Sequence, residues 1–351
     1  MENTHIDVQN YYGSELQSSE DLQTNACCTL TAPPKHILEA LSLVADEVQA
    51  KYYGCGLTIP SAIEGLRILD LGSGSGRDCY IASKLVGENG YVVGVDMTDE
   101  QLKVANDHIE YHTEKFGYKK ANVEFIKGNI EELGELNLEK GSFDIIISNC
   151  VINLANDKQK VLNDAYELLK PGGEMYFSDV YSNRRIPMNL QKDKVLWGEC
   201  LSGALYWNDF LNYAKKAGFT DPRVMEDKPI TIDNKELEVI VGDIKFYSVT
   251  YRLWKIEGLE SDCEDYGQAI MYKGGIPEND FALALDNHHY FEKGKIESVC
   301  GNSYNMLHKT RFKKYFEFYG SFDTHYGIYA GCGGNAPFSD EGNSNAEDCG
   351  C

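Results

Sequence analysis

Short apolar runs alternate with amphipathic stretches over the middle of the chain. The runs have the aliphatic and β-branched character of buried strands, and we expect five strands, at 67–71, 91–96, 123–127, 143–148 and 174–179. Between the runs, apolar residues recur at helical spacing, as at Val161, Leu162, Ala165 and Leu168. Strands that alternate with helices at this pitch predict an α/β fold with a doubly wound, mostly parallel sheet.

Local residues mark where the helices begin and end. Thr98 and Gln101 have capping-box spacing at the start of a helix that Gly117 ends. Asp157 begins another helix, which ends before Pro171. Ahead of the sheet, apolar residues at i, i+4, i+7 and i+11 predict one further helix, at Ile37, Leu41, Val44 and Val48.

The pattern changes near residue 258, beyond a predicted helix at 207–217 and a predicted strand at 245–254. Short strands separated by Gly, Pro and Asn turns follow without crossover helices, at 268–272, 281–285, 289–291 and 295–299. The last residues are Gly, Ser, Asn and acids, which bury too little apolar surface to order themselves. We therefore expect an arm with a helix at 1–61, the doubly wound domain at 62–257, a small, mostly antiparallel domain at 258–330 and a flexible tail at 331–351.

A glycine-rich turn follows the first predicted strand. The sequence from Arg67 to Asp78 is RILDLGSGSGRD, and glycines without Cβ atoms let the backbone approach a ligand closely, at Gly72, Gly74 and Gly76. From Arg77 the chain predicts a helix whose free N–H groups face that ligand. Twenty residues after Gly76, the second strand ends in Asp96, which is placed to accept the ribose hydroxyls of a nucleoside.

The spacing of the glycines argues against a dinucleotide. The dinucleotide fingerprint G-x-G-x-x-G would need its third glycine at Arg77. The observed G-x-G-x-G, with Asp70 just ahead, resembles the first motif of S-adenosylmethionine-dependent methyltransferases. A tight turn without a ligand is the plain alternative, and Asp96 makes it the weaker one.

Polar residues and a cysteine follow the other predicted strands. Because ligands bind beyond the carboxyl ends of strands in such sheets, these residues are candidates for the same site. Asn129 is suited to the adenine edge and Ile130 to its ring face, with Glu131 beside them. Asn149 and Cys150 follow the fourth strand, and this order brings Cys150 to the edge of the cleft.

The chain has eleven cysteines, and four of them fall in predicted loops or at strand ends. These are Cys27, Cys55, Cys150 and Cys200. Buried cysteines are usually small apolar filler, which we assign to Cys79 on the helix after the glycine turn. Structural zinc favours Cys-x-x-Cys pairs, which these four do not form. Scattered thiolates suit a softer, three-coordinate acceptor such as trivalent arsenic, whose lone pair can attack a sulfonium methyl group without a general base.

Composition narrows the setting. A net charge of −22 argues against binding to a phosphate backbone, so we expect no nucleic acid partner. The polar residues 1–13 lack the apolar core of a signal peptide, and no run of about 18 uncharged apolar residues is present to span a membrane. Reduced thiols, and hence a cytoplasmic protein, are the natural expectation. We expect a monomer.

Several segments together resemble the arsenite methyltransferase family. They are DLQTN at 21–25, KYYGCG at 51–56, LDLGSGSGRDCY at 69–80, SNCVINL at 148–154, GGEMYFSDVY at 172–181, KVLWGECLSGALYW at 194–207, NKELE at 234–238 and, more weakly, YKGG at 272–275. The resemblance covers nearly the whole chain and is strong to about residue 255. It implies a class I methyltransferase fold that binds S-adenosylmethionine, with no structural metal.

The resemblance also implies residue roles. Cys150 and Cys200 would be the principal As(III) thiolates, and Cys27 would complete the site, although Cys28 beside it leaves the arm ligand ambiguous. Cys55 would join a disulfide relay restored by thioredoxin or glutathione, and Tyr53 would face the sulfonium. Arsenite and methylarsenite would be the substrates. The residues that would hold the cofactor are Asp70, Gly72, Gly74, Gly76, Arg77, Asp96, Met97, Asn129, Ile130, Glu131 and Asn149.

Two rival functions stay open at this point. A methyltransferase acting on carbon or nitrogen of a small metabolite would need a base, for which the strand ends offer no obvious candidate. A thiol-rich metalloid-binding protein without turnover would keep the cysteines but would have no use for the glycine turn and Asp96.

Overall fold

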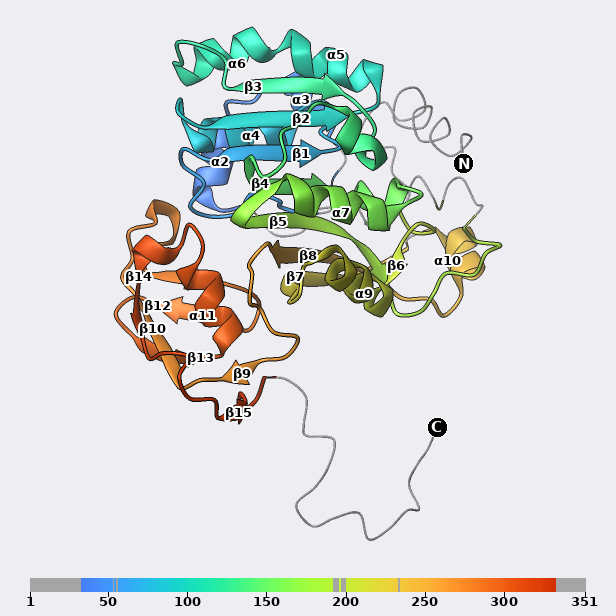
Figure 1. The fold of residues 1–351 in the computed structure, drawn as a ribbon. Coiled ribbons are helices and arrows are strands. Elements are labelled where there is room, and N and C mark those ends of the chain that lie inside the picture. The colour runs from blue at the N-terminus through green and yellow to red at the C-terminus, as the bar shows by residue number, and fades with distance from the viewer. Residues whose placement is uncertain are drawn as a thin grey trace.

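The computed structural model describes residues 33–332, except 53, 55, 192–195, 197–199 and 233. Its central sheet has the order β3-β2-β1-β4-β5-β8-β7 (Figure 1). The first five of these strands run parallel: β1 (Arg67–Leu71), β2 (Tyr91–Asp96), β3 (Val123–Lys127), β4 (Phe143–Asn149) and β5 (Leu169–Ser182). β8 (Phe246–Trp254) and β7 (Arg223–Ile230) are antiparallel, and the short β6 (Leu205–Tyr206) pairs with β5. The prediction of a doubly wound, mostly parallel sheet is confirmed.

Helices cover both faces of this sheet. One face carries α2 (Lys35–Leu41), α3 (Asp46–Ala50), α4 (Arg77–Val86), α5 (Asp99–Asp107) and α6 (Ile109–Phe116). The other carries η4 (Ile130–Glu135), η5 (Ile152–Leu154), α7 (Lys158–Leu168) and α9 (Trp207–Ala217). Successive strand residues alternate between the two layers, so Ile68 packs into one core and Leu69 into the other. Burial of both faces explains why the strands read as continuous apolar runs.

Two local predictions differ from the structure. The apolar stripe from Ile37 to Val48 is split between α2 and α3, because Ala45 is extended and donates its N–H to Nε2 of His112 at 3.2 Å. Thr98 does begin α5, but its side chain makes no capping bond. Its hydroxyl instead bonds to Asp96. A contact with a distant helix thus breaks the first element, and a bond back to the end of β2 replaces the cap in the second.

The region after β8 is built mainly from antiparallel strands. β10 (Gln268–Tyr272) lies between β13 (Ile296–Val299) and β14 (Phe316–Tyr319). Two further pairs are β11 (Ala282–Ala284) with β12 (Tyr290–Glu292), and β9 (Glu264–Asp265) with β15 (Gly327–Ile328). The remaining helices are α10 (Lys235–Val241), η6 (Pro277–Asn279), α11 (Gly301–His308) and η7 (Lys313–Tyr315). α11 was not predicted, because it opens on Gly-Asn-Ser, which are weak helix formers.

A buried ionic network joins this region to the sheet. Glu174 of β5 is fully buried and accepts from Arg252 of β8 at 2.9 Å. It also pairs with Arg311, which follows α11 and donates to the carbonyl of Ser61 at 3.0 Å. Burial alone would raise the pKa of Glu174, but the two guanidinium groups hold it below its usual value. The network fixes the C-terminal region against the sheet edge at β5 and β8.

In the part of the chain that the structure describes, no helix has the length and the apolar character needed to cross a lipid bilayer.

Candidate functional site

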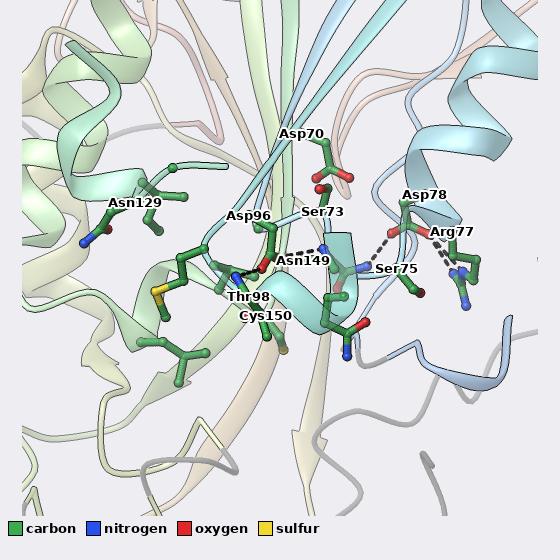
Figure 2. Close-up of a pocket in the computed structure, with 18 of the residues that line it drawn as sticks. Asp70, Ser73, Ser75, Arg77, Asp78, Asp96, Thr98, Asn129, Asn149 and Cys150 are labelled. Carbon is green, nitrogen blue, oxygen red and sulfur yellow. Dashed lines mark hydrogen bonds and ion pairs between the residues drawn. The ribbon is translucent and has the colours of Figure 1, made fainter. Parts of the chain in front are cut away.

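A cavity of about 950 Å³, counting the part open to solvent, lies at the carboxyl ends of β1, β2 and β4 (Figure 2). It is lined by nearly all of the residues predicted to hold a cofactor: Asp70, Gly72, Gly74, Arg77, Asp96, Met97, Asn129, Ile130, Glu131 and Asn149. Gly76 does not line it. Tyr52, Val151 and Leu154, which sequence reasoning did not single out, add to the wall.

The glycine turn forms one side of the cavity through left-handed backbone. Gly74 has φ +52°, and a Cβ there would meet nothing closer than 4.0 Å, so the backbone is open to a ligand. Gly76 has φ +88° and serves packing instead, since a Cβ would lie 2.6 Å from the ring of Phe125. The turn therefore needs these glycines for two different reasons.

Asp96 is fixed in front of the turn by backbone donors. Its Oδ2 accepts from the N–H of Gly74 at 2.8 Å, and its Oδ1 accepts from the N–H of Thr98 at 2.8 Å (Figure 2). Burial raises the pKa of this carboxyl, and the bonds from Thr98 and Gly74 oppose the rise. The carboxylate is held rigidly where the sequence placed a ribose acceptor.

Asp70, at the end of β1, has a different electrostatic environment. Its side chain accepts from the thiol of Cys79 at 3.2 Å and is buried. Burial first, and then the neighbouring Asp78, raise its pKa to about 8. Burial therefore favours the neutral form of Asp70. Cys79 is fully buried, as the predicted packing role requires, and in addition holds this carboxyl.

Asn149 ties the segment before the sheet to the cavity. Its amide donates to the hydroxyl of Tyr52 at 2.7 Å, to the carbonyl of Gly56 at 2.9 Å and to Asp78 at 3.0 Å. The guanidinium of Arg77 lies 3.1 Å from the centre of the Tyr52 ring. Asn149 also lines the cavity, so its predicted contact with the cofactor stays a prediction. The bonds to Tyr52, Gly56 and Asp78 were not predicted from the sequence.

Cys150 and Cys200, fifty positions apart in the chain, are in contact with each other. The thiol of Cys200 donates to the backbone carbonyl of Cys150 at 3.3 Å, and both side chains belong to one buried apolar cluster. Cys150 lines the cavity and takes part in a disulfide, while Cys200 carries a thiol. Both have positive φ, +57° and +60°, which is uncommon for residues other than glycine. Cys27, Cys28, Tyr53 and Cys55 lie outside the described residues.

A buried polar cluster behind the two cysteines escaped the sequence reasoning. Asn153 donates to both carboxyl oxygens of Asp179, at 3.0 and 2.6 Å. Burial lowers the pKa of Lys158 to about 8, against the attraction of Asp179, Glu131 and Cys200, and burial raises the pKa of Asp179 to about 6. The position of Asp179 could have indicated this cluster, because Asp179 lies near the carboxyl end of β5, and functional residues gather at the carboxyl ends of such strands.

The residues around the cavity fit S-adenosylmethionine. The fixed Asp96 carboxylate suits the ribose, the open backbone at Gly74 admits a close ligand, and Ile130 offers an apolar surface to adenine.

Comparisons with known proteins agree with this geometry. The sequence profile of a methyltransferase domain matches residues 63–218, and that of the arsenite methyltransferase C-terminal domain matches residues 266–335. Arsenite methyltransferase of Aquipseudomonas alcaligenes is 56% identical over 334 residues, covering 95% of this chain and 96% of that protein. The human arsenite methyltransferase is 50% identical over 313 residues, covering 88% and 82%.

A solved structure shares the fold closely. The crystal structure of an arsenic(III) S-adenosylmethionine methyltransferase from Chlamydomonas reinhardtii is 52% identical and superposes with a TM-score of 0.82, covering 85% of this chain and 100% of that one. Likeness of this extent spans both the sheet and the C-terminal region. This chain belongs to the arsenite methyltransferase family.

Proposed function

We propose that this chain transfers methyl groups from S-adenosylmethionine to thiolate-bound trivalent arsenic, giving methyl- and dimethylarsenicals. The observation that carries the proposal is the bond from the thiol of Cys200 to the backbone of Cys150, which lines the nucleoside cavity. When bound, S-adenosylmethionine supplies an electrophilic methyl group on its sulfonium.

The cavity residues would orient the cofactor. Asp96 would accept the ribose hydroxyls, while the turn at Gly72 and Gly74 would hold the amino-acid end. Asn129 accepts from the N–H of Glu131 at 2.9 Å, which orients its amide at the cavity wall toward the adenine. Each role is supported by the position of the residue in the lining.

The cysteines would hold the arsenic substrate. Cys150 and Cys200 would be two of its thiolates and Cys27, in the arm, the third. Both described cysteines are buried, with exposed fractions of 3% and 0%, so water is excluded where the arsenic lone pair would attack. Because the lone pair is the nucleophile, the chain needs to supply position and no general base. Tyr53 would face the sulfonium.

A thiol relay would keep the arsenic trivalent between methylations. We propose that Cys55 joins this relay and that thioredoxin or glutathione restores the thiols. The disulfide at Cys150 supports it, because this cysteine is then able to change redox state. The free thiols among the described cysteines favour a reducing, cytoplasmic setting, and we expect a monomer.

The test is to incubate the protein with arsenite, S-adenosylmethionine labelled in its methyl group and a thiol, and then to separate the arsenic species. We expect label on arsenic with the wild type, none with Cys150→Ser or Cys200→Ser, and wild-type amounts with Cys332→Ser, a thiol remote from the cavity. Arsenite that binds without gaining label would contradict the proposal and favour sequestration. Label on carbon or nitrogen of another metabolite would favour the other rival.

A further inference from the structure

Three more cysteines converge far from the cavity, beside the β9–β15 pair (Figure 1). Cys263 directly precedes β9, Cys332 follows β15, and Cys300 is the N-cap of α11. The thiol of Cys332 donates to the sulfur of Cys263 at 2.6 Å, and the thiol of Cys263 donates in turn to Cys300. The three sulfur atoms form a continuous chain of contacts.

Cys300 is the last of the three sulfur atoms in this row and accepts hydrogen bonds from its neighbours. Its sulfur lies 3.5 Å from the backbone nitrogen of Ser303 and 3.9 Å from a guanidinium nitrogen of Arg223. The bond from Cys263, with Ser303 and Arg223, lowers the pKa of Cys300 to about 5 despite burial, and correspondingly raises the pKa of Cys263. Cys300 is fully buried, whereas Cys263 and Cys332 are partly exposed.

The close approach of Cys263 and Cys332 is unlike a metal site. Thiolates that share a tetrahedral zinc ion, at Zn–S distances of about 2.3 Å, keep their sulfur atoms about 3.7 Å apart. The 2.6 Å separation lies between that spacing and a disulfide bond of about 2.05 Å. The backbone is also in place, because the N–H of Tyr329 donates to the carbonyl of Cys263 at 2.7 Å.

We propose that Cys263 and Cys332 form a reversible disulfide, and that this bond pins the chain after β15 to the start of β9. The site is separate from the arsenic site and does not depend on the proposed function. Its substrate is a small-molecule disulfide.

The exchange balances as two steps. The thiolate of Cys332 attacks one sulfur of the small disulfide, whose S–S bond breaks, and the released thiolate takes up the Cys332 proton. The thiolate of Cys263 then attacks the sulfur of Cys332, which expels the second small thiolate. That thiolate takes up the proton that Cys263 has lost. Two protein thiols are oxidised and one small disulfide is reduced to two thiols.

The position of the pair joins it to the contact between the C-terminal region and the sheet. Arg223 of β7 pairs with Asp286 at 3.0 Å, and Asn302 of α11 donates to Asp221 at 2.9 Å. The partners of Cys300 thus belong to the ionic contacts between the two parts. Closing the disulfide would fix Cys332, the last residue that the structure describes, beside these contacts.

The experiment uses the full chain in glutathione buffers of increasing oxidised fraction, quenched by alkylation and mapped as peptides without reduction. We expect a Cys263–Cys332 linked peptide that dithiothreitol removes. Cys332→Ser abolishes it, and the control Cys79→Ser forms it as the wild type does. Absence of the linked peptide from the wild type at every ratio, or preferential pairing of Cys263 with another cysteine, would overturn the proposal.

A second measurement needs no variant. Hydrogen exchange at the amide of Tyr329 in the wild type is expected to slow at least several-fold on oxidation and to recover on reduction. A disulfide that forms without slowing this exchange would overturn the pinning of the chain after β15.

Discussion

Two cysteines at the cavity hold backbone conformations that usually belong to glycine. Cys150 and Cys200 both have φ near +60°, and Cys200 is fully buried. A residue with a Cβ pays about 1–2 kcal/mol for this conformation, so something other than local preference must hold it. The bond from Cys200 to the carbonyl of Cys150 and the surrounding apolar cluster supply that restraint. The thiol of Cys200 is therefore held against the backbone of Cys150.

This conformation predicts an unusual order of stability. We expect Cys200→Gly to be about 1 kcal/mol more stable than Cys200→Ala in urea unfolding, because glycine tolerates positive φ. The matched pair at Cys79, inside α4, should show the reverse order by a similar amount, since glycine weakens a helix. An alanine variant at position 200 that equals or exceeds the glycine variant would contradict the strain at this residue.

The turn between β1 and α4 shows how an element combines ligand access with packing. Gly76 begins α4 in the left-handed region, and a Cβ added there would lie 2.6 Å from the ring of Phe125. Gly117 ends α6 in the same region, and a Cβ added there would meet nothing within 4 Å. The two glycines share a backbone conformation and differ in their surroundings. They form a natural pair for separating backbone strain from steric clash.

Alanine at these two positions should have different costs. We expect Gly117→Ala to lower the free energy of unfolding by about 1 kcal/mol, from strain alone. Gly76→Ala should cost about 1–3 kcal/mol more, because its Cβ would also displace Phe125. Chemical denaturation of both variants measures the difference. Equal losses would show that the contact with Phe125 adds nothing.

Comparison of sequence and structure shows which elements were predictable. The parallel strands and α9 were found because their apolar periodicity is strong and their ends carry caps or turns. The break between α2 and α3 was missed because it depends on His112, distant in the chain, accepting from Ala45. At the site, strand ends pointed to Asp96 and Cys150, but the sequence carried no sign that Asn149 bonds Tyr52. Long-range contacts decide these details.

At the scale of the whole molecule, buried charge joins the C-terminal region to the sheet. Glu174 has no exposed surface and pairs with two arginines. Arg252 comes from β8, and Arg311 comes from the segment after α11. Removing one member of such a network leaves buried charge uncompensated, which is far more costly than losing an exposed ion pair. The network therefore couples the unfolding of the two parts.

Replacement of the central carboxylate tests this coupling. We expect Glu174→Gln to lower the free energy of unfolding by about 3–5 kcal/mol, because Arg252 and Arg311 lose their counter-charge. The control Glu167→Gln removes an exposed pair with Lys140 and should cost under about 1 kcal/mol. Calorimetry on both variants gives the comparison. Similar small losses would mean that the network does not hold the regions together.

The proposed function depends on one arsenic site to which cysteines far apart in the chain each contribute a sulfur atom. Its most direct measurement is arsenic X-ray absorption of the reduced protein loaded with one equivalent of arsenite. We predict three sulfur neighbours in the wild type and in Cys332→Ser, and replacement of one sulfur by a lighter atom in Cys200→Ser. An unchanged shell of three sulfur atoms in Cys200→Ser, or oxygen in the wild-type shell, would contradict the central claim.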